Sequence, residues 1–179
     1  TEGRPAFDRA VPAPGFEADE VLRLAASLDQ GSEHPLAETI VRAARERGMV
    51  LDKPEGFESG SGIGVRATVA GRQLALGNST LMQQLGIGVD SLLDQAEALR
   101  VEGASVMHLA VDGKLAGLLA VSDPVKASTP EALLTLKAAG LRIVMATGDG
   151  QTTAKAVAAK LGIDKVFGEV KPADKLLLV

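Results

Sequence analysis

The segment Ser105–Val121, SVMHLAVDGKLAGLLAV, carries the clearest folding signal in the chain. Two apolar runs, residues 105–111 and 115–121, lie on either side of Asp112-Gly113. This dipeptide favours the left-handed backbone angles that a two-residue hairpin turn requires. The segment therefore predicts two antiparallel strands joined by a tight turn.

A second hairpin is predicted upstream, over residues 65–76, where apolar and polar side chains alternate on both sides of Ala70-Gly71. Helices are predicted over residues 21–28, from Pro35, and over residues 92–99, because apolar residues recur there at helical spacing. Pro35 suits the first helical position, where a missing N–H costs nothing. Hairpins with helices between them predict an α+β domain with an antiparallel sheet flanked by helices.

Strands and helices alternate after Val121. The pattern predicts a helix over 130–139, a strand over 141–146, a helix over 152–161, a strand over 165–170 and a further helix from Pro172. This alternation is typical of a parallel, Rossmann-type sheet, here an incomplete one, and the fold is α/β overall. We assign residues 6–119 to the first domain, 120–179 to the second, and 1–5 to a remnant of the second.

The composition excludes several classes of function. The 179 residues carry a formal net charge of -4, which offers no electrostatic footprint for nucleic acid. Cysteine is absent and only two histidines are present, which excludes thiolate sites and histidine-rich metal clusters. The longest apolar run, residues 115–121, is far short of the ~20 residues that span a bilayer. We expect a soluble, monomeric chain that does not span a membrane, with no secretory leader and no metal site of its own.

Three motifs in the first domain could bind a ligand. Ser32-Glu33-His34-Pro35 places an imidazole at the mouth of a helix, where it could meet a purine ring or simply cap the helix. Gly60-Ser61-Gly62-Ile63-Gly64 lets a backbone approach a ligand closely, or forms a plain bulge between strands. It is no dinucleotide fingerprint, because the spacing is G-x-G-x-G and a strand follows. Gly77-Asn78 closes a strand, and Asn78 alone indicates only a helix cap or turn.

The second domain offers a different kind of site. Thr147-Gly148-Asp149 follows a predicted parallel strand, at the edge where open α/β sheets bind ligands. These residues suit a phosphoryl group or its magnesium, although Asp149 could equally cap the next helix. Lys175 could add positive charge, but a lone lysine is more often solvated. Asp123 and Lys126, in Asp-Pro-Val-Lys at the domain junction, favour a helix-start turn.

Together and in this order, these motifs resemble those of heavy-metal (type IB) P-type transport ATPases, most closely the copper exporters. The resemblance covers the chain from Thr1 to Val179, because six motifs follow one another in the family's order. It implies a cytosolic ATP-binding domain inserted in a haloacid-dehalogenase-like phosphorylation domain. The ligands would be ATP or ADP and Mg2+. The partners would be the membrane transport domain and actuator domain of a parent protein, on the cytoplasmic side of a membrane.

The resemblance also implies roles for individual residues. Those expected around the adenosine of ATP are Glu33, His34, Gly60, Gly62, Ile63, Gly64, Gly77 and Asn78. Asp29 stands where the family has a glutamate, whose side chain is one methylene longer. Those expected near the transferred phosphoryl group and its magnesium are Asp123, Lys126, Thr147, Gly148, Asp149 and Lys175.

No catalytic nucleophile is expected within this chain. Thr1-Glu2-Gly3 resembles the residues that follow the family's phosphorylated aspartate, and its Gly-Asp-Gly-x-Asn-Asp segment would lie beyond Val179. Covalent catalysis requires that aspartate, so we expect nucleotide binding without significant turnover. The parent would export Cu+ in preference to Ag+, Zn2+, Cd2+ or Co2+. Two alternatives stay open: a free-standing haloacid-dehalogenase-type phosphatase that uses Thr147, Asp149 and Lys175, and a non-catalytic regulatory module.

Overall fold

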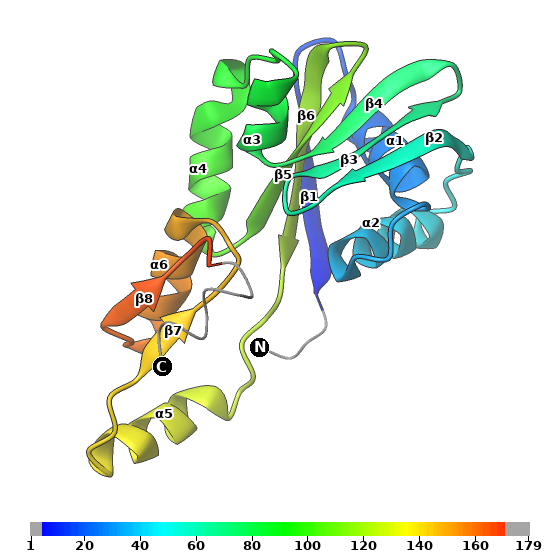
Figure 1. Ribbon diagram of the computed structural model, residues 1–179. Helices are drawn as coiled ribbons and strands as arrows, with labels where there is room; N and C mark the ends of the chain where they lie inside the picture. Colours follow the sequence, from blue (N-terminus) through cyan, green and yellow to red (C-terminus); the bar gives the residue numbers. More distant parts are fainter. Residues whose placement is uncertain (1–4, 171–179) are drawn as a thin grey trace. The chain divides into compact units, whose positions relative to one another are not determined.

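Six strands form the central sheet of the computed structural model, which describes residues 5–170. Their order across the sheet is β1-β6-β5-β4-β3-β2 (Figure 1). The strands are β1 (Ala6–Pro12), β2 (Pro54–Gly60), β3 (Gly64–Val69), β4 (Arg72–Gly77), β5 (Ser105–Val111) and β6 (Lys114–Ser122). Neighbours pair antiparallel, and β5 and β6 are the two arms of the hairpin predicted from their sequence.

Both predicted hairpins are confirmed, and both turn through left-handed residues. Asp112 and Gly113 have φ values of 50° and 77°, while Ala70 and Gly71 have 49° and 76°. Positive φ at both central residues is what the tight turns of hairpins require. The Asp112 carboxylate also accepts a 2.8 Å hydrogen bond from the backbone N–H of Gln73, which ties the β5–β6 turn to the start of β4.

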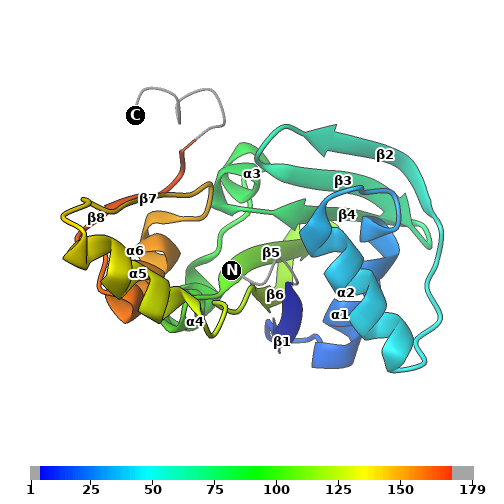
Figure 2. The same cartoon turned by 90° about the horizontal axis from the view of Figure 1, so that it is seen from below.

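Helices cover both faces of this sheet. They are α1 (Ala18–Asp29), α2 (Pro35–Glu46) and α3 (Ser79–Gln84). Side chains of a strand alternate between faces. Accordingly, Leu74 and Leu76 of β4 are buried in one cluster with α1 and α2, whereas Ala75 is buried in another with α3. In Figure 2, α1 and α2 lie together against the sheet, with α3 at the end of β4.

The chain divides into two compact units. The first consists of Pro5–Ala96 and Val106–Ser122 and contains the helices and sheet just described; the second consists, among the described residues, of Glu97–Ser105 and residues 123–170. The elements of the second unit are the end of α4 (Leu93–Glu102), which follows a 3-10 turn at Asp90–Leu92, and α5 (Thr129–Ala138), β7 (Val144–Ala146), α6 (Gln151–Leu161) and β8 (Lys165–Phe167).

The second unit holds a two-stranded parallel sheet, as predicted, but its strands are short. β7 pairs with β8 through three residue pairs, from Val144–Lys165 to Ala146–Phe167. The sequence predicts longer strands, over 141–146 and 165–170. Residues 141–143 and 168–170 have no strand partner among the described residues. The helix predicted from Pro172 lies outside the described residues. α6 is anchored by Thr153, Ala154 and Ala158, which are buried, and α5 has no buried residue.

Candidate functional site

His34 lies at the start of α2 and caps it. Its Nδ1 accepts a 3.2 Å hydrogen bond from the backbone N–H of Leu36. The backbone N–H of His34 donates to the Ser32 hydroxyl at 3.2 Å. A ring nitrogen that accepts carries no proton, so the neutral imidazole holds its proton on Nε2. The residue is exposed. The cap therefore orients the ring and leaves one N–H donor and the ring faces open to a ligand.

Asp29 is the last residue of α1, at the other end of the loop that leads to His34. The residue is only 5% exposed, and within residues 5–170 its carboxylate has no hydrogen bond or ion pair. Burial disfavours the charged carboxylate and raises the pKa of Asp29 to about 7. Removing a carboxylate from water without giving it a partner costs free energy, and it leaves the group able to accept a hydrogen bond from a ligand.

The loop between Asp29 and His34 rests on the sheet through one close contact. A Cβ built on Gly31 would lie 2.6 Å from the ring of Phe57 in β2, so a larger residue there would force the ring to move. Phe57 lies three residues before Gly60 on the same strand, and thus connects this loop to the glycine-rich turn. Phe57 could not be selected from the sequence, because its strand lacks the alternation that marks β3. Glu33 is exposed in the loop.

The other residues expected around adenosine gather at the carboxyl end of β2. Gly60–Gly64 forms the turn between β2 and β3, and Gly64 lies directly across from Gly77 of β4. Asn78 follows, caps α3 and donates from Nδ2 to the Gly62 carbonyl oxygen at 3.0 Å. The structure therefore brings Gly60, Gly62, Ile63, Gly64, Gly77 and Asn78 into one cluster, at the meeting point of three strands and a helix.

In the second unit, Thr147 and Asp149 form a hydrogen-bonded group at the carboxyl end of β7. The Thr147 hydroxyl donates to Asp149 Oδ2 at 2.7 Å, and the Ser105 hydroxyl donates to Oδ1 at 2.9 Å. Asp149 does not cap α6, whose N-cap is Gly150 and has no side-chain hydrogen bond. Ser105 is thus a neighbour of this group that no sequence motif indicated.

The remaining predicted residues are not drawn into that group. Asp123 and Lys126 lie at the start of the second unit, and neither is bonded to Thr147 or Asp149 within residues 5–170. Oδ1 of Asp123 is buried with no hydrogen-bond partner in that part of the chain. Lys175 lies outside the described residues. Among residues 5–170, no group of three or more His, Asp or Glu is placed to hold a metal ion.

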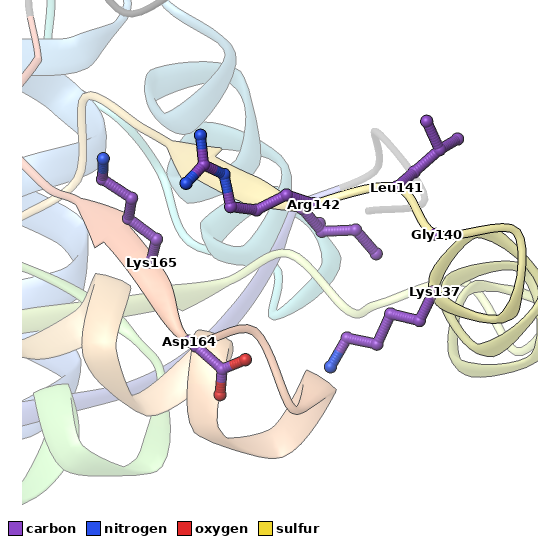
Figure 3. A pocket seen from close by; sticks show the side chains of 7 residues that line it. Lys137, Gly140, Leu141, Arg142, Asp164 and Lys165 are labelled. Carbon is purple, nitrogen blue, oxygen red and sulfur yellow. The ribbon is translucent and has the colours of Figure 1, made fainter.

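A separate cavity of about 350 Å3 lies at the amino ends of β7 and β8 (Figure 3). Its lining residues are Lys137, Gly140, Leu141, Arg142, Ile143, Asp164 and Lys165. None of the predicted site residues contributes to it, because Thr147 and Asp149 follow β7 at its carboxyl end. The hydrogen-bonded clusters, rather than this cavity, therefore define the candidate sites.

Comparisons with known proteins identify the family. Residues 1–179 match the haloacid dehalogenase-like hydrolases, and the chain belongs to this family. Within this family, the relatives similar in sequence include P-type ATPases. The chain is 50% identical over 179 residues to a copper-exporting P-type ATPase of Legionella pneumophila, a match that covers 100% of this chain and 24% of that protein. The chain thus spans about a quarter of that relative's length, and the resemblance to copper exporters predicted from its motifs is confirmed.

Solved structures place the fold among P-type ATPase domains. A zinc-transporting PIB-type ATPase in the E2.Pi state matches 99% of this chain and 28% of its own, with a TM-score of 0.69 and 29% identity. The N-domain of HMA6, a copper-transporting P-type ATPase, matches 66% of this chain and 99% of its own, with a TM-score of 0.56 and 28% identity. The predicted α/β class is therefore confirmed. No helix within residues 5–170 has the length and apolar character needed to cross a membrane.

Proposed function

We propose that this chain is the ATP-binding cytosolic part of a P-type ATPase that exports a heavy metal, with Cu+ as the cargo. The observation that carries the proposal is the pair at the two ends of one loop: Asp29, a buried carboxylate without a partner, and His34, an exposed imidazole held by its own cap. Copper is favoured by the 50% identity to a copper-exporting relative, against 29% to a zinc-transporting structure.

The chemistry of adenine fits this pair. Adenine offers an exocyclic amino group as a donor, ring nitrogens as acceptors and two flat faces. Asp29 would accept from the amino group, and His34 would stack on the ring or donate to it from Nε2. Glu33 and Gly62 would border the nucleoside, and Asn78 would lie next to Gly62. Neither Tyr nor Trp occurs in the chain, so the base has no large aromatic platform and affinity should be modest.

The phosphoryl end of ATP would be presented to an aspartate outside this chain. Thr147, Asp149 and Lys175 would flank the transferred group. Asp123 and Lys126 would belong to the same phosphorylation domain, formed by residues 1–5 and 120–179. Mg2+ commonly binds one or two carboxylates together with phosphate oxygens and waters. Asp149 could supply one such oxygen, so the described residues fit part of a magnesium site and ATP would supply much of the rest.

In the parent, domain closure would bring the γ-phosphate to the aspartate. Phosphoryl transfer depends mainly on positioning and charge neutralisation, so the base site acts as the fixed end of the substrate. The membrane transport and actuator domains would be the partners, and the chain would lie on the cytoplasmic side of the membrane. This chain alone would bind ATP without significant turnover.

Calorimetric titration tests the proposal. ATP and a non-hydrolysable analogue are titrated into the wild-type chain, His34→Asn and Glu38→Gln. Asparagine is as good a helix cap as any residue but lacks the imidazole, so it separates the ring from the cap. We expect His34→Asn to weaken binding about tenfold, or about 1.4 kcal/mol. Glu38 is exposed in the same first turn and serves as the matched control.

Two results would count against the proposal. Absence of saturable binding to the wild-type chain at millimolar ATP would remove the nucleotide site. Equal affinities for the wild-type chain and His34→Asn would move the base away from α2. Hydrolysis of a generic phosphate ester by the wild-type chain would favour the phosphatase alternative. If the chain neither binds ATP nor hydrolyses the ester, the regulatory module is favoured.

A further inference from the structure

The turn between β2 and β3 is closed on itself and anchored at one end. The N–H of Ile63 donates to the Gly60 carbonyl oxygen at 3.1 Å, and Gly62 has a φ of 73°, as the third position of a type II turn requires. The Ile63 side chain packs against the apolar cluster that contains Leu81 and Met82 of α3. Ser61 and Gly62 remain exposed at the tip.

Two glycines bring the neighbouring strand unusually close to this turn. A Cβ on Gly77 would lie 2.1 Å from the Ile63 carbonyl oxygen, and one on Gly64 would lie 2.3 Å from the Leu76 carbonyl oxygen. Real Cβ atoms do not come this near to backbone oxygens, so these glycines serve the packing of backbone on backbone. By contrast, a Cβ on Gly62 would meet no atom within 4 Å.

Asn78 completes the connection, with its backbone and both ends of its carboxamide in use. Its N–H donates to the Ile63 carbonyl oxygen at 3.0 Å, and its Nδ2 donates to the Gly62 carbonyl oxygen at 3.0 Å. Its Oδ1 accepts from the N–H of Leu81 at 3.1 Å and so caps α3. The carboxamide therefore joins the tip of the turn to the first turn of the helix.

We propose that Asn78 is a positioning residue, which holds the Ser61–Gly62 tip in the shape that meets the nucleotide, and that Gly62 rather than Asn78 makes the contact. This inference rests on the proposed function, because it assigns the ligand of the turn. A tip fixed to α3 keeps its peptide groups oriented before ATP arrives, so less ordering is needed on binding. An untethered tip, with Ser61 and Gly62 both exposed, would have to be ordered by the ligand itself.

The test uses Asn78→Ser in the 179-residue chain. Serine keeps an uncharged oxygen that can accept from the N–H of Leu81, but it is too short to reach the Gly62 carbonyl oxygen. The apo protein is examined by 15N heteronuclear NOE at Ser61 and Gly62, its stability by urea titration, and its ATP affinity by calorimetry. Gln83→Ala, at an exposed position of the same helix, is the matched control.

We expect Asn78→Ser to lower the heteronuclear NOE of Ser61 and Gly62 before any ligand is added. ATP affinity should fall about five- to tenfold, while the urea midpoint and the control stay near the wild-type values. Weaker binding with an unchanged tip would show instead that Asn78 touches the nucleotide, and would overturn the inference. A loosened tip with unchanged affinity would overturn it too. If the wild-type chain binds no ATP, the proposed function fails, whereas the NOE still decides whether Asn78 orders the tip.

Discussion

Replacing Asp29 by asparagine should stabilise the protein, and increasingly so as the pH rises. The Asp29 side chain lies at the end of α1, 5% exposed, and has no hydrogen-bond partner within residues 5–170. Burial raises the pKa of its carboxyl group from 3.8 to about 7. Asparagine has nearly the same shape and never carries a charge, so the variant removes the ionisation and little else.

The magnitude follows from the two pKa values. Below pH 3.8, the carboxyl is neutral in the folded and the unfolded chain alike. As the pH rises from 3.8 to about 7, the unfolded chain ionises freely while the folded chain keeps its proton, so the free energy of unfolding falls. Each pKa unit is worth about 1.4 kcal/mol, which gives a loss of about 4 kcal/mol as an upper value. Above pH 7 the loss is complete and constant.

Urea titrations between pH 4.5 and 8 would measure this effect on the wild-type chain and Asp29→Asn. Cross peaks of α1 amides should be followed by NMR, because the chain has no Trp or Tyr and its two units need not unfold together. The difference in unfolding free energy should grow with pH and level off near pH 7. Asp19→Asn, in the first turn of the same helix with its side chain 80% exposed, should show no such trend. Parallel curves for the wild-type chain and Asp29→Asn would refute the burial of an ionisable, unpaired carboxyl.

Two further substitutions test the packing around the candidate sites. Gly77→Ala should lower the free energy of unfolding by about 3 kcal/mol in urea titrations, because its Cβ would overlap the Ile63 carbonyl oxygen. Gly88→Ala, with open space around the new Cβ, should lower it by under about 1 kcal/mol. Equal losses would contradict the close approach of β3 and β4. Thr153→Val should lower the stability of the second unit by about 1–2 kcal/mol, since it leaves the Ala104 carbonyl oxygen without its 2.8 Å hydrogen bond. Hydrogen exchange of the α6 amides measures this loss. Thr135→Val, at an exposed position of α5, should have little effect on the exchange, and a similar loss in both variants would contradict the role of the hydrogen bond between Thr153 and Ala104.

The hairpins could be predicted from local patterns. Asp112-Gly113 adopts the left-handed angles that its residue types suggest, whereas the hairpin around Ala70-Gly71 is indicated by the alternation of apolar and polar residues on both sides of its turn. β1 and β2 gave no such signal, because each contains an irregularity in its ladder, between Phe7 and Arg9 and between Glu55 and Glu58. A bulge shifts the faces of the residues after it, so regular alternation is lost. Only the pairing with β6 and β3 makes these segments strands.

The sequence could single out the candidate site residues, but not what each of them contacts. Residue spacing shows that glycines and an asparagine recur near two strand ends, yet it cannot show which Cβ would collide with a carbonyl oxygen and which would meet empty space. That distinction depends on the pairing of Gly64 with Gly77 across two strands. Ser105 and Phe57 could not be selected for a related reason. Ser105 contacts Asp149 and Phe57 contacts Gly31, and these partners are distant in the sequence, so no local motif indicates the contacts.

The structural role of His34 is compatible with the binding role that we propose for it. A cap is the simplest explanation of a polar residue before Pro35, and the geometry bears it out. The same hydrogen bond holds the imidazole in one orientation and one tautomer, which a freely rotating surface histidine would have to acquire on binding. If the ring binds a nucleotide as proposed, the cap lowers the entropic cost of that binding. Five residues earlier, Asp29 destabilises the free protein because its carboxyl group is buried. A hydrogen-bond donor on the ligand would offset that cost. Under the proposed function, both ends of the loop thus prepare the protein for a ligand with a flat ring and an amino group.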